Sequence, residues 1–323
     1  MILAGIDEAG YGPLLGPLVV GCCAFQLDAD PAADLPCLWK LFKKVIGKTR
    51  SKTGKRIHIN DSKLVYQPGP EGLKELEKGI LTLVATTFGD CANLPDVLKH
   101  VSPHVLDDLP KYNWYRSFDG ERFPAEVDAM AIKAFANALR IEMDLTKARC
   151  LHFGARVVLE RELNRQLDAT RNKSSVLFST SAMHLDHLIK TYGEQGLVIF
   201  CDQQGGRAHY GQLLRLMFED WALEIIREGD GFSEYRLTRN DHAVRIIWCE
   251  KAEAQCLPVA AASMLSKYLR EMLMRRFNAF WKVHLPDVKP TAGYYNDGLR
   301  FLRDIQQKRK ELSITDELLV RSR

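Results

Sequence analysis

The sequence predicts an α/β fold in which a β-sheet is flanked by helices. Apolar runs that are typical of buried strands occur at 2–7, 17–25 and 196–201. Helical periodicity runs through 71–88, and Pro258 opens a long helix that reaches about residue 283. Of the 323 residues, 46% are hydrophobic and 27% are charged, so the chain can bury a sizeable core and is not a disordered or fibrous protein.

The remaining elements follow from the same patterns in chain order. Glycine and proline between the first two strands predict a turn, and the residues without apolar side chains at 47–56 predict a loop. Prolines make the stretch 93–123 irregular. The other expected elements are helices at 35–46, 124–148, 208–228 and 297–308, and strands at 234–238 and 243–249.

The sequence also predicts the cellular compartment of the protein. No apolar run reaches the roughly 18 residues that span a bilayer, and Asp7 and Glu8 interrupt the apolar start, which argues against a secretory signal. The eight cysteines include no Cys-x-x-Cys pair, so they are expected to be reduced, buried thiols rather than disulfides or zinc ligands. We therefore expect a cytoplasmic protein that does not bind membranes. We also expect it to be a monomer.

Charge is distributed unevenly along the chain. Residues 1–39 carry five acids and no Lys or Arg, whereas residues 40–63 carry nine bases and one acid. An acidic segment followed by a basic one suits a polyanion held over a cation site, and it equally suits an ordinary solvated loop. Charge alone does not decide between these two interpretations.

The strongest local signal lies at the end of the first strand. Asp7 and Glu8 follow an apolar strand and precede glycines, and Asp202 ends a second apolar run. Glu250 and Glu253 follow the strand expected at 243–249. Carboxylates at neighbouring strand ends repel one another unless cations neutralise them, and oxygen ligands suit magnesium or manganese. The alternative for an isolated Asp-Glu pair is a plain acidic turn.

Histidines give a weaker signal. His184 and His187 stand three residues apart, a spacing that a helix would place on one face. No third ligand is obvious from the sequence, so we expect an exposed helix face rather than a metal site.

Taken together, these segments resemble the type 2 ribonuclease H family, the HII/HIII group. The resemblance is carried by Gly5-Ile6-Asp7-Glu8-Ala9-Gly10 with Gly12-Pro13-Leu14 and Gly16-Pro17, by Asn60-Asp61-Ser62-Lys63, by Asp202-Gln203, by Lys251-Ala252-Glu253 with the segment 259–267, and by Gly293-Tyr294. In this alignment Glu253, rather than Glu250, takes the fourth acidic place. Tyr11 departs from the family, which usually has Arg or Thr between these glycines.

The resemblance implies a ribonuclease H-like fold with a central mixed sheet flanked by helices. It implies one catalytic domain over 1–323, with a large insertion at about 66–180 and a C-terminal helical, basic segment at about 285–323. The implied reaction is hydrolysis of the RNA strand of an RNA–DNA hybrid, or of DNA with embedded ribonucleotides, leaving 5′-phosphate and 3′-hydroxyl ends.

The resemblance also implies roles for individual residues. Asp7, Glu8, Asp202 and Glu253 would be the catalytic and metal-binding acids for two divalent ions, Mg²⁺ or Mn²⁺. The implied substrate-binding residues are Gly10, Tyr11, Gly12, Asn60, Asp61, Ser62, Lys63 and Tyr294. Two rival functions remain open: a module that binds hybrids without cutting them, and a nuclease of similar design that cuts DNA.

Overall fold

The computed structural model describes residues 1–323 except 31–33, 68, 70–71, 119, 121 and 323. The strands are β1 (Ile2–Ala9), β2 (Leu18–Gln26), β3 (Ile46–Gly47), β4 (Ile57–His58), β5 (Arg149–Val158), β6 (Leu197–Asp202), β7 (Ala222–Arg227), β8 (Phe232–Arg239) and β9 (His242–Cys249). The helices are α1 (Leu38–Leu41), α2 (Ser62–Val65), α3 (Lys74–Phe88), α4 (Leu94–Val101), α5 (Ala129–Leu145), α6 (Glu160–Thr170), α7 (Lys173–Tyr192), α8 (Gly211–Met217), α9 (Ala252–Gln255), α10 (Leu257–His284), α11 (Tyr295–Asp304), α12 (Gln306–Glu311) and α13 (Asp316–Leu319). Three short 3₁₀ turns lie between residues 103 and 115.

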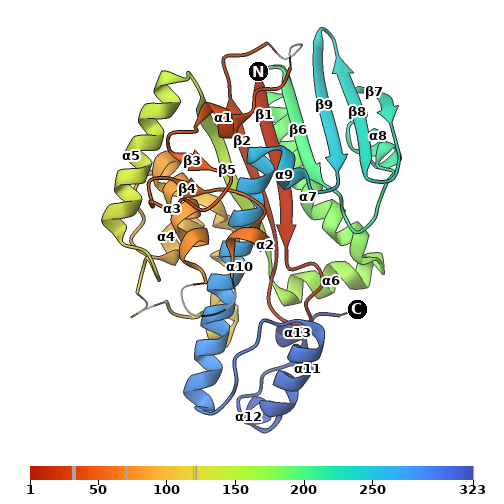
Figure 1. The fold of residues 1–323 in the computed structure, drawn as a ribbon. Coiled ribbons are helices and arrows are strands. Elements are labelled where there is room, and N and C mark those ends of the chain that lie inside the picture. Colours follow the sequence, from red (N-terminus) through yellow and green to blue (C-terminus); the bar gives the residue numbers. More distant parts are fainter. Residues whose placement is uncertain (31–33, 68, 70–71, 119, 121, 323) are drawn as a thin grey trace.

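A seven-stranded sheet forms the centre of the fold (Figure 1), with the strand order β5-β2-β1-β6-β9-β8-β7. Strands β1, β6 and β9 run parallel to one another, while the pairs at both sides of this trio are antiparallel. The prediction of an α/β fold with a central mixed sheet is therefore confirmed. The parallel trio brings the carboxyl ends of three buried strands to one edge of the sheet.

Helices cover both faces of the sheet and create two separate cores. One core packs α10, α3 and α5 against residues such as Leu3 and Cys23, while the other packs α6 and α7 against Ile6 and Cys22. The alternation of neighbouring strand residues between faces explains this division. Each strand at the centre is apolar on both sides, which is why the sequence shows continuous apolar runs there.

Helix α10 lies unusually close to the sheet because glycines face it. A Cβ at Gly5 would lie 2.1 Å from the backbone nitrogen of Val259, and a Cβ at Gly21 would lie 2.4 Å from the carbonyl oxygen of Ala262. The N-terminal part of α10 therefore packs directly on the backbone of β1 and β2. This contact holds the start of α10 beside the strand ends.

Several boundaries differ from the prediction. The helix expected at 208–228 is wrong beyond residue 217, because residues 222–227 form β7, an exposed edge strand paired with β8. Within the range 66–180, where the resemblance implies an insertion, β5 pairs with β2 as part of the central sheet. Within the described part of the chain, no helix is both long enough and apolar enough to cross a membrane.

Candidate active site

Four carboxylates gather where the parallel strands end. Asp7 and Glu8 lie near the end of β1, Asp202 is the last residue of β6, and Glu253 lies in α9 directly after β9. Because β1, β6 and β9 are parallel neighbours, these positions share one edge of the sheet. The backbone nitrogen of Ala252 donates to Asp202 Oδ1 at 3.1 Å, which ties the start of α9 to the end of β6.

The electrostatics show that the four acids affect one another. Burial raises the pKa of Asp7 well above its usual value, and the charges of Glu8, Asp202 and Glu253 raise it further. Burial, together with the charge of Asp202, raises the pKa values of Glu8 and Glu253 to about 7, and burial also raises the pKa of Asp202. Four acids held together in this way resist ionisation without a compensating cation.

The donor set fits hard divalent cations. All four side chains offer carboxylate oxygens, and Glu253 Oε2 is buried without a hydrogen-bond partner. Among the described residues, no three of these carboxylates have oxygens within 4.8 Å of one another, so an ion shared by three acids would require side-chain rotation. Glu250 is exposed, whereas Glu253 is buried and shares a side-chain hydrogen bond with Asp202.

The segment 60–63 faces this acidic cluster. Burial tends to lower the pKa of Lys63, but the carboxylates of Asp61, Asp7, Glu253 and Asp202 raise it above its usual value overall. The exposed Lys63 ammonium is therefore held near the four acids. Such a cation can neutralise the cluster and can also bind a phosphate.

The other residues of this segment hold its backbone. Asn60 Nδ2 donates to the carbonyl oxygen of Lys48 at 2.9 Å, and Asp61 accepts from the backbone nitrogen of Lys63 as the N-cap of α2. Ser263 Oγ donates to Ser62 Oγ at 3.0 Å, and Ser263 also hydrogen-bonds Asp7. No sequence pattern assigns a separate role to Ser263, because its contacts with residues 62 and 7 exist only after α10 packs on the sheet.

The glycines after β1 differ in what surrounds them. Gly10 has φ +88°, and a Cβ there would lie 2.5 Å from the carbonyl oxygen of Pro17. Gly12 is exposed, and a Cβ there would meet no atom within 4 Å. Gly10 is therefore required by the turn itself, whereas Gly12 leaves its backbone open to an approaching molecule.

Tyr11 projects from this turn toward the loop after β6. Its hydroxyl would lie 3.5 Å from a Cβ at Gly205, and its ring packs partly buried against the core on the α7 side. Burial raises the pKa of Tyr11, and Glu8 contributes to the same shift. Tyr11 therefore connects two loops at the rim of the acidic cluster.

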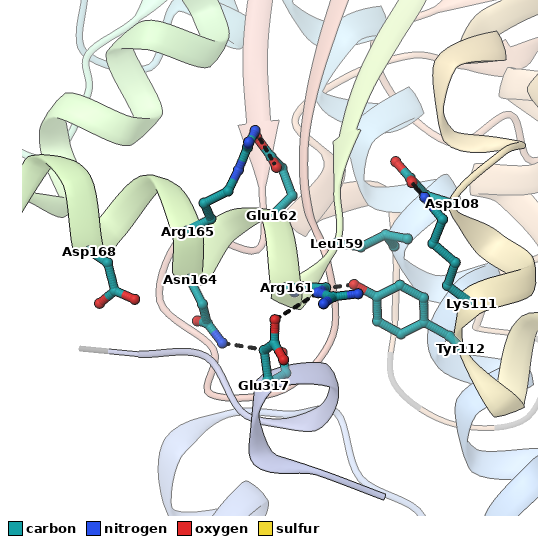
Figure 2. Close-up of a pocket in the computed structure, with 10 residues that line it drawn as sticks. All are labelled: Asp108, Lys111, Tyr112, Leu159, Arg161, Glu162, Asn164, Arg165, Asp168 and Glu317. Carbon is teal, nitrogen blue, oxygen red and sulfur yellow. Dashed lines mark hydrogen bonds and ion pairs between the residues drawn. The ribbon is translucent and has the colours of Figure 1, made fainter.

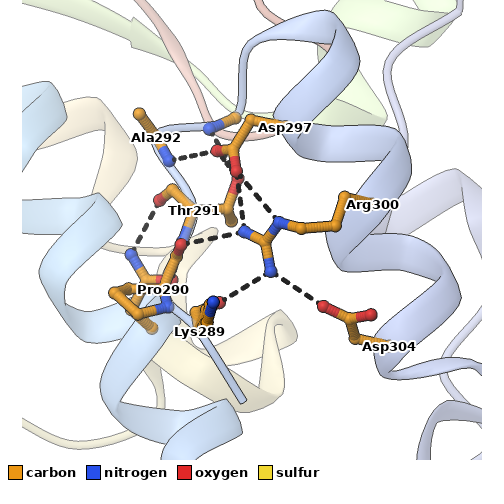
Figure 3. Close-up of polar contacts among 9 residues, drawn as sticks. Lys289, Pro290, Thr291, Ala292, Asp297, Arg300 and Asp304 are labelled. Atoms are coloured by element: carbon orange, nitrogen blue, oxygen red, sulfur yellow. Dashed lines mark hydrogen bonds and ion pairs between the residues drawn. The ribbon is translucent and has the colours of Figure 1, made fainter.

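Tyr294 lies where α11 begins, on a loop held by its own polar contacts. Figure 3 shows Asp297 accepting from Thr291 and Ala292, while Arg300 pairs with Asp297 and donates to the carbonyl oxygens of Lys289 and Pro290. The preceding residue, Gly293, accepts hydrogen bonds from the backbone nitrogens of Leu14 and Leu15 at 2.7 and 3.1 Å. Tyr294, with 55% of its surface exposed, is thus fixed beside the turn that carries Gly12.

A pocket of about 580 Å³ lies elsewhere, between α6 and α13 (Figure 2). None of the four acids lines it. Three ion pairs line it: Arg161 with Glu317, Lys111 with Asp108, and Arg165 with Glu162. The pocket marks the joint between α6 and the C-terminal segment rather than the acidic site.

A central mixed sheet flanked by helices is the architecture that the sequence resemblance implied. Comparison with known proteins shows what the chain is similar to. No family model matches the chain. Curated proteins named ribonuclease HII do match: one from Chlamydia abortus is 27% identical over 131 residues, covering 41% of this chain and 53% of the relative. The match therefore spans about half the length of that relative.

A second ribonuclease HII, from Methanocaldococcus jannaschii, is 27% identical over 200 residues, covering 61% of this chain and 79% of the relative. Among solved structures, the RNase HII complex with PCNA from Archaeoglobus fulgidus contains a chain that aligns with a TM-score of 0.42 at 15% identity, over 100% of this chain and 95% of that chain. The sequence matches confirm the resemblance to the type 2 ribonuclease H family, and the mixed sheet flanked by helices agrees with the fold that this resemblance implies.

Proposed function

We propose that this protein is an endonuclease that hydrolyses the RNA strand of RNA–DNA hybrids. The observation that carries the proposal is the gathering of Asp7, Glu8, Asp202 and Glu253 at one sheet edge, with pKa values raised by burial and mutual repulsion. The similarity to proteins named ribonuclease HII supports the choice of substrate. The expected products carry 5′-phosphate and 3′-hydroxyl ends.

These four acids would hold two Mg²⁺ or Mn²⁺ ions, which would activate a water molecule and stabilise negative charge at the scissile phosphate. Residues around the four acids would position the substrate. The exposed Lys63 would bind a phosphate beside the acids, and the open backbone at Gly12 would let the ribose 2′-hydroxyl approach. Tyr294 offers an exposed ring on a fixed loop for contact with a sugar.

A cleavage assay tests the proposal. The full chain is incubated with end-labelled substrates: an RNA–DNA hybrid, a DNA duplex with one ribonucleotide, and a matched all-DNA duplex, each with Mg²⁺, Mn²⁺ or chelator. We expect metal-dependent cleavage of at least one ribose-containing substrate and none of the all-DNA duplex. Binding of the hybrid without cleavage would favour the binding module, and cleavage of the all-DNA duplex would favour a DNA nuclease.

A second prediction concerns the basic loop 47–56. Lys48 Nζ donates to the carbonyl oxygen of Ala254, which places the loop beside α9 and its Glu253. Lys52 and Lys55 are exposed. Replacing both by Gln should flatten the slope of log affinity against log salt by roughly 0.7–0.9 for each phosphate that the loop no longer binds.

The measurement is hybrid binding across a salt series, carried out with chelator so that no cleavage occurs. As a control, Lys147 and Lys190 are exposed lysines on other elements, each paired with an acid, and their Gln variants should leave the slope unchanged. Equal slopes for the loop variant and the wild type would show that the loop is an ordinary solvated surface.

A third prediction separates the two glycines of the turn. Gly12→Ala should reduce cleavage by about tenfold or more while leaving the unfolding temperature unchanged, because its added methyl group meets only space that the substrate would use. Gly10→Ala should instead destabilise the fold by about 1–3 kcal/mol, because its φ is positive and Pro17 blocks the Cβ.

The matched control is Tyr11→Phe, which keeps the ring between the two loops and removes only the hydroxyl. Turnover and thermal unfolding are measured for all three variants. If Tyr11→Phe alone erased discrimination between ribose and deoxyribose, the open backbone at Gly12 would not be the recognition element.

A further inference from the structure

Three possible metal ligands meet on the opposite face of the sheet from Asp7. Cys22 Sγ and one ring nitrogen each of His152 and His184 lie within 4.8 Å of one another. They come from β2, β5 and α7, and Cys22 belongs to the core that packs against α7. The prediction that the histidine pair forms an exposed helix face is wrong for His184, which is buried with 6% of its surface exposed, while His187 is exposed.

The surroundings of His152 leave one polar atom without a partner. His152 Nε2 is buried and accepts or donates no hydrogen bond to any described residue. The residue paired with Cys22 across the strands is Gly154, and a Cβ there would lie 3.0 Å from this same nitrogen. The missing side chain at Gly154 therefore makes the room in which the ring of His152 lies beside Cys22.

His184 is oriented by the backbone. Its Nε2 lies 3.0 Å from the carbonyl oxygen of Val20, so the tautomer that donates this hydrogen bond leaves Nδ1 as a free acceptor. A histidine that binds a metal through one nitrogen commonly donates its other N–H to a backbone carbonyl. The contact with Val20 would fix both the tautomer and the ring of His184 for that role.

We propose that this cluster binds one zinc ion through Cys22, His152 and His184. Sulfur and imidazole nitrogen are the ligands that zinc prefers, in contrast to the all-oxygen set of the acidic cluster. Zinc lies about 2.0–2.3 Å from such ligands, so small side-chain rotations would close the three atoms around an ion. The exposed ring of His187 lies 4.7 Å from that of His152, beside the cluster.

The protonation of the histidines suits this role. Burial lowers the pKa of His152 to about 4 and that of His184 to about 3, so both rings are neutral at pH 7, the form that binds metals. Burial raises the pKa of the Cys22 thiol, so zinc binding would release its proton. The bound ion would connect two outer strands of the sheet to α7 and thereby stabilise the fold.

Cobalt substitution tests the proposal without relying on nuclease activity. The full chain, reduced and stripped with chelator, is titrated with Co²⁺ in excess Mg²⁺, which occupies the oxygen ligands of the acidic cluster. We expect one equivalent to bind with a thiolate-to-cobalt charge-transfer band and the visible bands of a tetrahedral ion, and zinc should displace it. Wild-type protein without a charge-transfer band would overturn the proposal, whatever the variants do.

Variants then assign the ligands. Cys22→Ser should lose the charge-transfer band, and His152→Asn, which changes a partly buried side chain, should weaken cobalt binding by more than about a hundredfold. The matched control is Cys23→Ser: Cys23 is equally buried on the same strand but belongs to the opposite core, so its variant should keep the band. A folded Cys22→Ser or His152→Asn protein that still binds one equivalent with the full band would refute the assignment.

Discussion

Asp7→Asn and Asp202→Asn are each expected to reduce metal-dependent cleavage of a hybrid by at least about a thousandfold. Asparagine removes the negative charge that would hold a divalent ion but keeps a side-chain oxygen. That oxygen can still accept the backbone hydrogen bonds from Glu8 at Asp7 and from Ala252 at Asp202. The loss should therefore fall on turnover rather than on folding or on hybrid binding.

The same substitutions carry a prediction about pH. The pKa values of the four acids are raised in the folded state, to about 7 for Glu8 and Glu253. A carboxyl whose pKa is raised on folding stabilises the protein below its unfolded pKa, and this contribution is lost as the pH rises through the folded pKa. The metal-free wild type should thus lose stability between about pH 4.5 and pH 7, and the Asn variants should lose less.

Thermal unfolding at pH 5.5 and pH 8, with chelator or with Mg²⁺, measures this difference. Mg²⁺ should raise the unfolding temperature of the wild type more at pH 8 than at pH 5.5, and it should do little for Asp202→Asn. Asp28→Asn serves as a control, because Asp28 is an exposed acid paired with Lys147. A variant of Asp7 or Asp202 with near wild-type turnover would remove that residue from the mechanism.

The parts of the fold that are predictable from sequence are those where burial determines composition. Strands β1, β2 and β6 are buried on both faces, so their continuous apolar runs are unambiguous. Strand β5 has no such run, because Arg149, His152 and Arg156 interrupt it on its partly exposed side. The prediction of a helix at β7 is wrong because this strand lies at the exposed sheet edge, where no alternation of buried and exposed residues marks it.

The candidate site is predictable as a set of residues but not as an arrangement. Local patterns indicate Asp7 and Asp202, because each follows its own apolar strand. No local pattern shows that Ser263 reaches both Ser62 and Asp7, since that contact depends on how α10 packs on the sheet. The cluster of Cys22, His152 and His184 is invisible in the sequence for the same reason, because its members come from three separate elements.

Arg270 holds the turn after β1 in place, and no sequence pattern indicates this role. It lies on α10 with 2% of its surface exposed, and its guanidinium donates to the carbonyl oxygens of Pro17, Leu15 and Ala292 at 2.6, 3.0 and 3.1 Å. Three glycines with positive φ surround the Arg270 side chain: Gly10, Gly16 and Gly293. A Cβ at any one of them would lie within 3.2 Å of that side chain. These glycines lie in the segments that carry the resemblance to the family. Their lack of a side chain leaves the room in which Arg270 packs.

Arg321 secures the same turn from the far end of the chain. Its guanidinium donates to the carbonyl oxygens of Gly10 and Pro13 at 2.6 and 3.0 Å, and its backbone nitrogen donates to the carbonyl oxygen of Leu14. Glu160, fully buried with a pKa raised to about 7 by burial, lies near both arginines, and their charges act against that increase. The turn after β1 is thus held by two buried cations, which come from parts of the chain far from the turn in sequence.

Arg270→Met is accordingly expected to destabilise the protein by at least about 3 kcal/mol, because three buried carbonyl oxygens lose charge-assisted donors at once. Urea unfolding measures the loss. Arg275→Met is the matched control on the same helix, since Arg275 forms a surface ion pair with Glu126 and should cost no more than about 1 kcal/mol. Below its unfolding transition, Arg270→Met should also cleave hybrids more slowly, because the turn that carries Gly12 loses its anchor while the four acids remain in place. Equal stability of the two variants would mean that the turn keeps its conformation without Arg270, and that the glycines around it are needed for some other contact.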